Sequence, residues 1–345
     1  MKFCCHKTYY FVGALFLAIT AVVLSVYWLL PPKTEPFINT SQAGQVKVAP
    51  KIEATLKLLQ VGDIMLDRHI ETLIARHGLD SLLGQLKTAN FFENYDFIGG
   101  NLEGPATNQG AYYSPVKEID FAFKPDNVGA LKNYGFNFFG LANNHFYDQG
   151  ERGIKESREN LSKLGFEFAG VKEGALDDGS VVFLEKNGLK IGFLSLSLTY
   201  AKVNEQTLKN LIKKAKAESD WLLVSVHWGQ EYQHQANQEQ QRLAYLMIDE
   251  GADLVVGHHP HVIQNMESYK GRLIFYSLGN FLFDQYFSAD TQEGLALSLV
   301  FSPSRLDGHL VALKSKTSVL RLATTKESDT MVKTYNLKPT FSLEK

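Results

Sequence analysis

From residue 54 onward, short apolar runs alternate with segments in which apolar residues recur every three or four positions. Apolar runs bounded by turn residues predict buried strands, and the longer spacing predicts amphipathic helices. The expected strands cover 56–62, 95–99, 136–142, 166–169, 221–228, 252–257 and 272–279, and the expected helices cover 69–89, 125–134, 150–164, 205–219 and 238–250. Hairpins are expected to turn at Asn187-Gly188, within 181–197, and at Lys270-Gly271, while residues 294–340 are strand-rich. This alternation predicts an α/β fold with mixed sheets flanked by helices.

The longest apolar run lies near the N-terminus. Residues 9–30 form 22 residues without a charge, with Tyr9 and Tyr10 at one end and Tyr27-Trp28 at the other. A helix of this length spans the ~30 Å hydrocarbon core of a bilayer, and aromatic residues are typical of its two interfaces. A cleaved signal peptide is the alternative, but its apolar core normally has about 7–15 residues and ends in small side chains. The pattern favours one uncleaved transmembrane helix.

Charge near this helix predicts its orientation. Lys2 and Lys7 precede it, so the positive-inside rule places the tail 1–8 in the cytoplasm and the body of the protein outside. Residues 31–53 are polar and rich in proline, which is typical of a linker. The sequence therefore predicts a single-pass membrane protein whose main domain, 54–345, lies outside the cytoplasm, at the cell surface or in the periplasm.

Polar residues cluster abruptly where six of the apolar runs end. The clusters are Gly62-Asp63, Asn101-Leu102-Glu103, Asn143-Asn144-His145 with Asp148, His227 with Glu231, His258-His259-Pro260-His261, and Asn280. Neighbouring strands of an α/β sheet end at a shared crevice in which ligands bind, so the clusters are expected to converge. Five of the ten histidines of the chain lie in these clusters, which is denser than scattered surface histidines would be.

Each cluster also has a purely structural interpretation. Asp63 could cap the following helix, and Asn144-His145 could form a turn, because asparagine tolerates left-handed geometry. Asp148 could orient a neighbouring side chain or cap a helix, and Asn280 could belong to a turn. Together at one edge of a sheet, the clusters favour a single functional site.

The residue types in the clusters indicate the chemistry. Histidine, aspartate, glutamate and asparagine without cysteine suit borderline or hard divalent ions, and Zn, Mn or Fe are expected here. Two such ions about 3.5–4 Å apart can lower the pKa of a bridging water to about 7, and a histidine that is not a ligand can protonate the leaving group. The sequence therefore predicts a hydrolytic site with one or two divalent metal ions.

Composition narrows the remaining function classes. The 345 residues include 35 basic and 37 acidic side chains, for a net charge of −2, whereas a nucleic-acid binder needs a basic excess. Cys4 and Cys5, which acylation could modify, are the only cysteines, so the domain has neither a disulfide nor a thiolate nucleophile. The sequence has no P-loop, GxGxxG or GxSxG motif, which leaves nucleotide-binding and serine-hydrolase functions without support.

The clusters, in this order, resemble the CapA family of bacterial capsule and poly-γ-glutamate biosynthesis proteins. The resemblance runs from about Leu56 to about Phe283. It rests on six motifs, which are Gly62-Asp63-Ile64-Met65, Gly100-Asn101-Leu102-Glu103-Gly104, Asn143-Asn144-His145 with Asp148, His227-Trp228-Gly229 with Glu231, Gly257-His258-His259-Pro260-His261-Val262 and Ser277-Leu278-Gly279-Asn280-Phe281. That family in turn resembles the calcineurin-like metallophosphoesterases. The resemblance therefore implies a sandwich of two mixed sheets flanked by helices, with a two-metal site at the strand ends.

The resemblance also assigns roles to individual residues. It implies metal ligands at Asp63, Glu103, Asn144, His227, His259 and His261, and it implies that His145 is the general acid. Residues that support these ligands or replace one of them are expected at Asn101, Asn143, Asp148, His258 and Asn280.

Two positions depart from the metallophosphoesterase pattern. Met65 stands where that pattern has the histidine of Asp-x-His, unless Asp67 or His69 compensates. Asn101 stands in place of the bridging aspartate, unless Glu103 substitutes for it. A site with fewer carboxylates holds two dications less tightly, so one ion, or weak binding, is an alternative to two.

Together these features predict a metal-dependent hydrolase that acts in making or releasing an anionic capsular polymer. Its substrate would be a phosphoester, amide or ester linkage, and its partners would be the polymer and the membrane machinery of capsule synthesis. The rival hypothesis is a non-catalytic assembly or export factor. Such a protein would bind the polymer at the strand-end cluster, with or without metal, and would not cleave it. Met65 favours the rival, whereas His145 beside a metal ligand favours catalysis.

Overall fold

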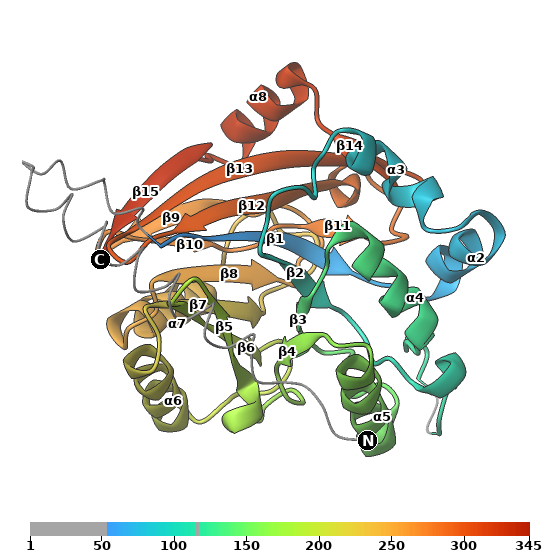
Figure 1. Ribbon diagram of the computed structural model, residues 1–345, viewed down its shortest axis with the longest axis horizontal. Coiled ribbons are helices and arrows are strands. Elements are labelled where there is room, and N and C mark those ends of the chain that lie inside the picture. The colour runs from blue at the N-terminus through green and yellow to red at the C-terminus, as the bar shows by residue number, and fades with distance from the viewer. Residues whose placement is uncertain (1–53, 115–116) are drawn as a thin grey trace, which may run out of the picture. The chain divides into compact units, whose positions relative to one another are not determined.

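The computed structural model describes residues 54–114 and 117–345. In this part of the chain, two β-sheets pack against each other and helices cover their outer faces (Figure 1). The expected transmembrane helix 9–30 and the expected linker 31–53 lie outside the described residues. Within residues 54–114 and 117–345, no helix combines the length and the apolar character needed to cross a membrane.

The larger sheet has nine strands, and its central strand β1 (Leu56–Ile64) joins a parallel half to an antiparallel half. The parallel half contains β2 (Phe97–Leu102), β3 (Phe138–Gly140) and β4 (Glu167–Ala169). The antiparallel half contains β12 (Glu293–Phe301), β13 (Arg305–Lys316), β14 (Val319–Leu322) and β15 (Thr340–Glu344). A short strand, β11 (Asn280–Leu282), runs parallel to the end of β1.

The smaller sheet has six strands in the order β5-β6-β7-β8-β10-β9. They are β5 (Val181–Lys186), β6 (Leu189–Ser197), β7 (Trp221–His227), β8 (Leu254–His258), β9 (Met266–Tyr269) and β10 (Arg272–Phe275). The four central strands are parallel, and the two edge strands are antiparallel to their neighbours. The two expected hairpin turns, at Asn187-Gly188 and Lys270-Gly271, are confirmed, and all four residues have positive φ.

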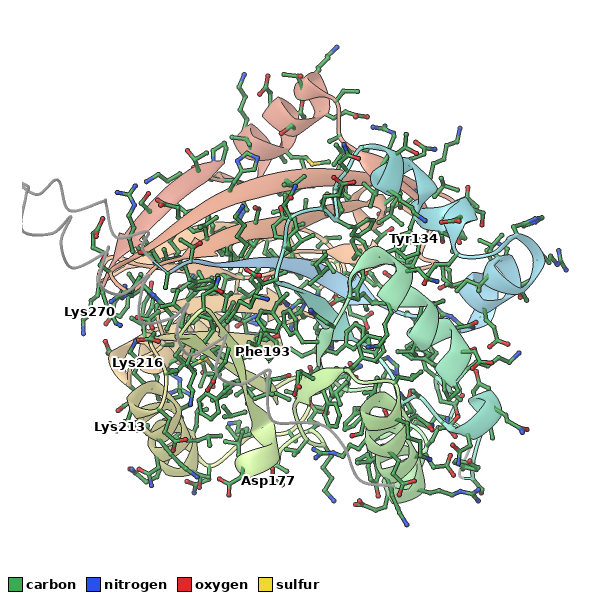
Figure 2. All side chains as sticks on the ribbon, in the orientation of Figure 1. Tyr134, Asp177, Phe193, Lys213, Lys216 and Lys270 are labelled. Carbon is green, nitrogen blue, oxygen red and sulfur yellow. The ribbon has the colours of Figure 1, made fainter. Side chains whose placement is uncertain are left out.

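The period-two alternation of side chains along the strands divides the core into layers. Leu58 packs between the two sheets, whereas its neighbour Leu59 packs beneath the helices of the larger sheet. Phe138 of β3 and Phe193 of β6 meet between the sheets with ring centroids 5.0 Å apart, and Figure 2 labels Phe193 there. The helices on the outer faces are α2 (Arg68–His77), α3 (Asp80–Thr88), α4 (Pro125–Ala130) and α5 (Gly150–Lys163) for the larger sheet, and α6 (Glu205–Ala217) and α7 (Gln238–Asp249) for the smaller one. The expected pair of mixed sheets flanked by helices is confirmed.

Two segments differ from the sequence expectation. The single helix expected over 69–89 is two helices, because Gly78, at φ 74°, ends α2 at His77 and its N–H bonds to the Ile74 carbonyl. The strand-rich C-terminal part also contains a helix, α8 (Thr325–Thr334), which the few apolar residues there do not reveal. The capping box formed by Thr324 with Glu327 is the sequence signal that identifies its start.

Candidate metal centre

The polar clusters converge where strands of both sheets end at their carboxyl termini. Residues 276–279, which connect β10 of the smaller sheet to β11 of the larger sheet, approach the backbone of both sheets closely at this point. A Cβ atom on Gly62 would lie 2.0 Å from the Gly279 carbonyl oxygen, and one on Gly257 would lie 1.9 Å from the Tyr276 oxygen. The Asp63 N–H donates to Gly279 at 3.1 Å, and the Leu278 N–H donates to Gly257 at 3.2 Å. Glycine is therefore required just before Asp63 on one sheet and just before the first histidine on the other.

Asp63, at the end of β1, lies at the middle of the cluster and is completely buried. Its Oδ1 accepts hydrogen bonds from His258 Nδ1 and from Asn101 Nδ2, both at 2.9 Å, and its Oδ2 accepts from the His259 N–H at 3.2 Å. Burial opposes ionisation of this carboxyl, but these bonds outweigh it and hold its pKa below the ordinary value. Asp63 is thus a carboxylate, and it is not a helix cap, because Asp67 caps α2.

Glu103 follows β2 and is also completely buried. Its Oε2 accepts from Asn101 Nδ2 at 3.2 Å, whereas its Oε1 has no hydrogen-bond partner and lies 3.6 Å from His261 Nε2. Burial, joined by repulsion from Asp63 and Glu231, raises the pKa of this carboxyl well above its ordinary value. Without a cation, Glu103 therefore favours its neutral form.

The two asparagines nearest the carboxylates differ in what they contact. Asn101 faces Asp63, Glu103 and His227 Nδ1 (3.3 Å), so it occupies the centre of the cluster as a neutral donor. Asn143 is buried, and its Nδ2 bonds to Asn101 and to two backbone carbonyls while its Oδ1 accepts from the His145 N–H. Asn143 therefore supports the loop after β3 and has no contact with the carboxylates.

His227 ends β7 and connects the smaller sheet to this loop. Its Nε2 lies 2.8 Å from Asn144 Oδ1, so the structure brings these two expected ligands into direct contact. Asn144 and His145 do lie in a turn, but neither residue has a positive φ. The left-handed geometry that a purely structural interpretation would require is therefore absent at these positions.

The loop after β8 places two histidines in strained conformations. His259 has φ 98° and His261 has φ 58°, backbone geometries that cost a non-glycine residue about 1–3 kcal/mol each and that are found in turns and, when held in a buried loop, at functional sites. His261 Nδ1 lies 3.0 Å from Asn280 Oδ1, at the start of β11. Because Asn280 also donates to the Thr291 carbonyl, it orients the His261 ring and is more than a turn residue.

His145 lies apart from the carboxylates and lines the adjoining pocket. Its Nδ1 is 2.7 Å from Asp148 Oδ2, which also accepts from the Phe121 N–H at 2.9 Å. Lys117 Nζ contacts the other carboxylate oxygen of Asp148 at 2.9 Å. Asp148 therefore orients His145, and it does not cap α5, because the N-cap of that helix is Gln149.

Three of the buried imidazoles, those of His227, His259 and His261, favour their neutral forms. Burial, followed by repulsion from the other histidines, lowers the pKa of His227 well below its ordinary value. Burial also lowers the pKa of His259 to about 3 and lowers that of His261. Neutral imidazoles and ionised carboxylates are the forms that bind metal ions.

The donor set fits a divalent cation. Two groups of side chains have ligand atoms within 4.8 Å of one another, namely Asp63, Glu103 and His261, and Glu231, His259 and His261. Glu103 Oε1, His258 Nε2 and His259 Nδ1 are buried atoms without a hydrogen-bond partner. Unpartnered buried polar atoms are costly unless something else satisfies them. A metal ion would satisfy such atoms at this place.

The two proposed replacements for the absent Asp-x-His histidine do not reach the cluster. Met65 itself is fully buried and packs in the apolar core of the larger sheet. Both carboxylate oxygens of Asp67 are bonded elsewhere, to the Arg68 and Ala122 N–H groups and to the Tyr112 hydroxyl. His69 is exposed and packs against Tyr286. The contacts of Asp67 and His69 therefore do not support the alternative that one of them compensates for Met65.

A pocket of about 650 Å³ opens beside the cluster, and several of its residues were not identified from sequence. The pocket is lined by His145 and His261 and also by Arg68, Tyr200, Tyr232 and Glu231. The Arg68 guanidinium pairs with Asp284 and lies over the rings of Phe121 and Phe283. Glu231 stood in a recognised motif without a role, whereas no local pattern distinguishes the other three from ordinary surface residues.

We expect Glu103→Gln to stabilise the metal-free protein at alkaline pH. A carboxyl whose folded pKa is raised contributes stability that is complete below about 4.5, the ordinary value, and is lost as pH rises through the folded pKa. Glutamine does not ionise, so the variant does not lose this stability as the pH rises. Each unit by which the folded pKa exceeds the unfolded pKa corresponds to about 1.4 kcal/mol of free energy of unfolding. In urea unfolding with chelator, the free energy of unfolding of the variant should therefore increase relative to that of the wild type as the pH rises from 5 to 8.

The matched control is Glu327→Gln. The pKa of that half-buried carboxyl is lowered by its hydrogen bonds with Arg321, so its stabilising contribution is present above the ordinary value, and the substitution should destabilise slightly at pH 8. If Glu103→Gln lost stability at pH 8 as the control does, the assignment of a neutral Glu103 would be wrong.

Among solved structures, two similar ones come from distant proteins. A hypothetical protein from Thermus thermophilus is 17% identical, with a TM-score of 0.48 over 84% of this chain and 100% of that one. Vacuolar Protein Sorting 29 from Cryptosporidium parvum is 10% identical, with a TM-score of 0.34 over 84% of this chain and 99% of that one. Both TM-scores are below 0.5.

Similarity at the sequence level is much stronger. "Capsule biosynthesis protein CapA" of Bacillus anthracis is 34% identical over 249 residues, which are 67% of this chain and 60% of that protein. "PGA biosynthesis protein CapA" of Bacillus subtilis (strain 168) is 34% identical over 263 residues, which are 72% of this chain and 69% of that protein. The chain thus spans less than two thirds of the B. anthracis relative. A family model described as "Bacterial capsule synthesis protein PGA_cap" matches residues 57–285, which include every expected site residue, and the chain belongs to that family.

Proposed function

We propose that this protein is a metal-dependent hydrolase that cleaves a phosphoester, amide or ester linkage of an anionic capsular polymer. The observation that supports this most is the meeting of two kinds of group at one pocket. One is the buried cluster with unpartnered ligand atoms on Glu103 and His259, and the other is His145 held by Asp148. A metal-binding cluster needs no oriented histidine beside it unless a proton has to be transferred.

The expected metal ligands all lie in this cluster. One or two ions would be held by six side chains, namely Asp63, Glu103, Asn144, His227, His259 and His261. Their mixture of imidazole and oxygen donors suits Zn, Mn or Fe. When bound, a divalent cation supplies Lewis acidity toward a substrate oxygen and neutralises developing negative charge.

His145 would donate a proton to the leaving group. Because Asp148 contacts Nδ1, the ring presents Nε2 as the nitrogen that exchanges a proton with a molecule in the pocket. The bonds of Asp148 to the Phe121 N–H and to Lys117 hold the carboxylate in place, so the ring keeps one orientation and one tautomer.

The walls of the pocket suit an extended anionic chain. Three cations line it, namely Arg68, Lys117 and Lys172. Each pairs with a carboxylate of the protein, and a carboxylate or phosphate of the polymer would exchange with that partner. Seven large apolar side chains of the described residues are exposed, and four of them also line this pocket, namely Ile119, Tyr147, Tyr200 and Tyr232. Exposed apolar side chains gathered at a pocket mark a binding surface.

The setting we propose follows from the family and from the N-terminal sequence. Relatives are named for capsule and poly-γ-glutamate (PGA) biosynthesis, so the substrate polymer would be capsular, with poly-γ-glutamate as the first candidate. The apolar segment 9–30 would anchor the chain, with the domain outside the cytoplasmic membrane and beside the capsule-synthesis machinery.

A non-catalytic assembly or export factor is the second candidate. Two departures from the metallophosphoesterase pattern favour it, because Met65 packs in the core and Asn101 puts a neutral amide where a carboxylate is expected. Such a protein would bind the polymer in the same pocket without cleaving it.

One experiment separates the two candidates. The purified full chain would be treated with chelator and reconstituted with Zn, Mn or Fe. It would then be assayed with a chromogenic phosphodiester, with γ-glutamyl p-nitroanilide and with poly-γ-glutamate. We expect bound metal and turnover of at least one substrate that chelator abolishes. Bound metal and polymer binding without turnover would favour the assembly factor, and the absence of bound metal after reconstitution would contradict the hydrolase.

A further inference from the structure

Glu231 lies on the loop that follows β7 and faces the histidine loop that follows β8. Its carboxylate, His259 and His261 have ligand atoms within 4.8 Å of one another. Asp63 and Glu103 form a second group of this kind, and they also use His261. The shared histidine places the two groups side by side.

Backbone hydrogen bonds hold Glu231 in this position. The Trp228 N–H donates to the His258 carbonyl at 3.1 Å, and the Tyr232 N–H donates to the Pro260 carbonyl at 2.9 Å. These bonds join the two loops on both sides of Glu231. The Trp228 indole also donates to the Tyr276 carbonyl at 2.9 Å, which fixes the start of the loop.

An ordinary ion pair does not account for Glu231. In the described part of the chain, no lysine or arginine forms a salt bridge with it. His259 Nδ1 is a buried atom without a hydrogen-bond partner, so the group holds a carboxylate side chain beside an unsatisfied imidazole nitrogen.

We propose that Glu231, His259 and His261 form a second cation position beside the one formed by Asp63, Glu103 and His261. Glu231 then supplies the ligand that is lost because Met65 lies in the core. It also adds a third negative charge, whereas Asp63 and Glu103 alone would have to balance two dications. This inference rests on the proposed metal-dependent function and identifies a residue that makes two ions tenable at that site.

The test compares Glu231→Gln with the wild type as purified full chains reconstituted with Mn²⁺. Glutamine keeps the size of the side chain and removes its charge, and Glu239→Gln makes the same change on α7, where Glu239 bonds to Arg242 outside the cluster. We expect elemental analysis to give about two Mn per chain for the wild type and the control, and about one for Glu231→Gln. The substitution removes the charged ligand of one ion and leaves the ligands of the other ion in place. Electron paramagnetic resonance should show an exchange-coupled Mn pair that the substitution converts to an isolated ion.

The outcomes distinguish failure of this inference from failure of the proposed function. Two coupled ions in Glu231→Gln, or one ion in both proteins, would overturn the role of Glu231 while the metal-dependent function stands. No bound Mn in the wild type would overturn both. If Glu231→Gln did not fold, Glu231→Asp, which keeps the charge but shortens the side chain, should lower the affinity of the second ion at least about 10-fold while the first stays bound. Equal affinities for both ions would contradict the proposal.

Discussion

His145→Ala should abolish turnover while leaving bound metal at the wild-type level. The ring contacts Asp148 and the pocket, and it makes no contact with Asp63 or Glu103, so its loss removes a proton donor and no metal ligand. General acid catalysis of this kind contributes about 10²–10⁴-fold to the rate. The rate constant kcat, measured on whichever substrate the wild type hydrolyses, should fall within that range.

The control for this substitution is His309→Ala, which removes an exposed histidine from β13. It should change neither kcat nor the metal content. If His145→Ala kept wild-type activity, the assignment of His145 as the acid would be wrong. If it lost metal together with activity, His145 would have to be reassigned as a ligand.

Removing His227 and His261 together should eliminate metal binding and the stability that metal confers. Both side chains are buried, His227 contacts Asn144 and His261 belongs to both groups of candidate ligands. A cation that binds only the folded state stabilises it by about 4 kcal/mol at 1,000 times its dissociation constant. Thermal unfolding with saturating metal and with chelator should therefore differ in the wild type and coincide in the double variant.

A control for the double variant removes two exposed histidines, His77 and His309. That protein should bind metal and respond to chelator as the wild type does. A double variant that retained stoichiometric metal would show that the strand-end cluster is not the site. Urea unfolding of both proteins in chelator would establish that any loss of metal occurs in a folded chain.

Much of the fold could be predicted because its signals are local. Apolar runs mark the strands, Asn187-Gly188 marks a turn with two positive φ angles, and the 3.6-residue period marks the helix at Gly150–Lys163. Local signals were weaker at the break in the first helix and in α8, where few apolar residues face the core. In both places a cap identifies the boundary, Gly78 at the end of α2 and Thr324 with Glu327 at the start of α8.

The composition of the candidate site was also visible in the chain, because parallel strands end at one edge of a sheet. That rule predicts that Asp63 meets Glu103 at the end of the larger sheet and that His227 meets His258 at the end of the smaller sheet. From the sequence, all of these residues were expected at the edge of one sheet, whereas the structure divides them between two. The rule does not say which atoms of these side chains find partners. Packing decided that Asp67 turns to Tyr112 and Ala122, that Met65 enters the core and that Glu231 faces His259.

Periodicity and turn chemistry therefore established the order of elements, the mixed sheets and the residue types that gather at the strand ends. Only the tertiary structure decided how residues 276–279 approach one sheet at Gly62 and the other at Gly257, and how Arg68, Tyr200 and Tyr232 come to line a common pocket. The physical reason is the distance along the sequence over which each kind of interaction acts. Backbone propensity acts over a few neighbouring residues, whereas the position of a side chain in a site depends on contacts between segments that lie up to about 200 residues apart, as with Asp63 and His258.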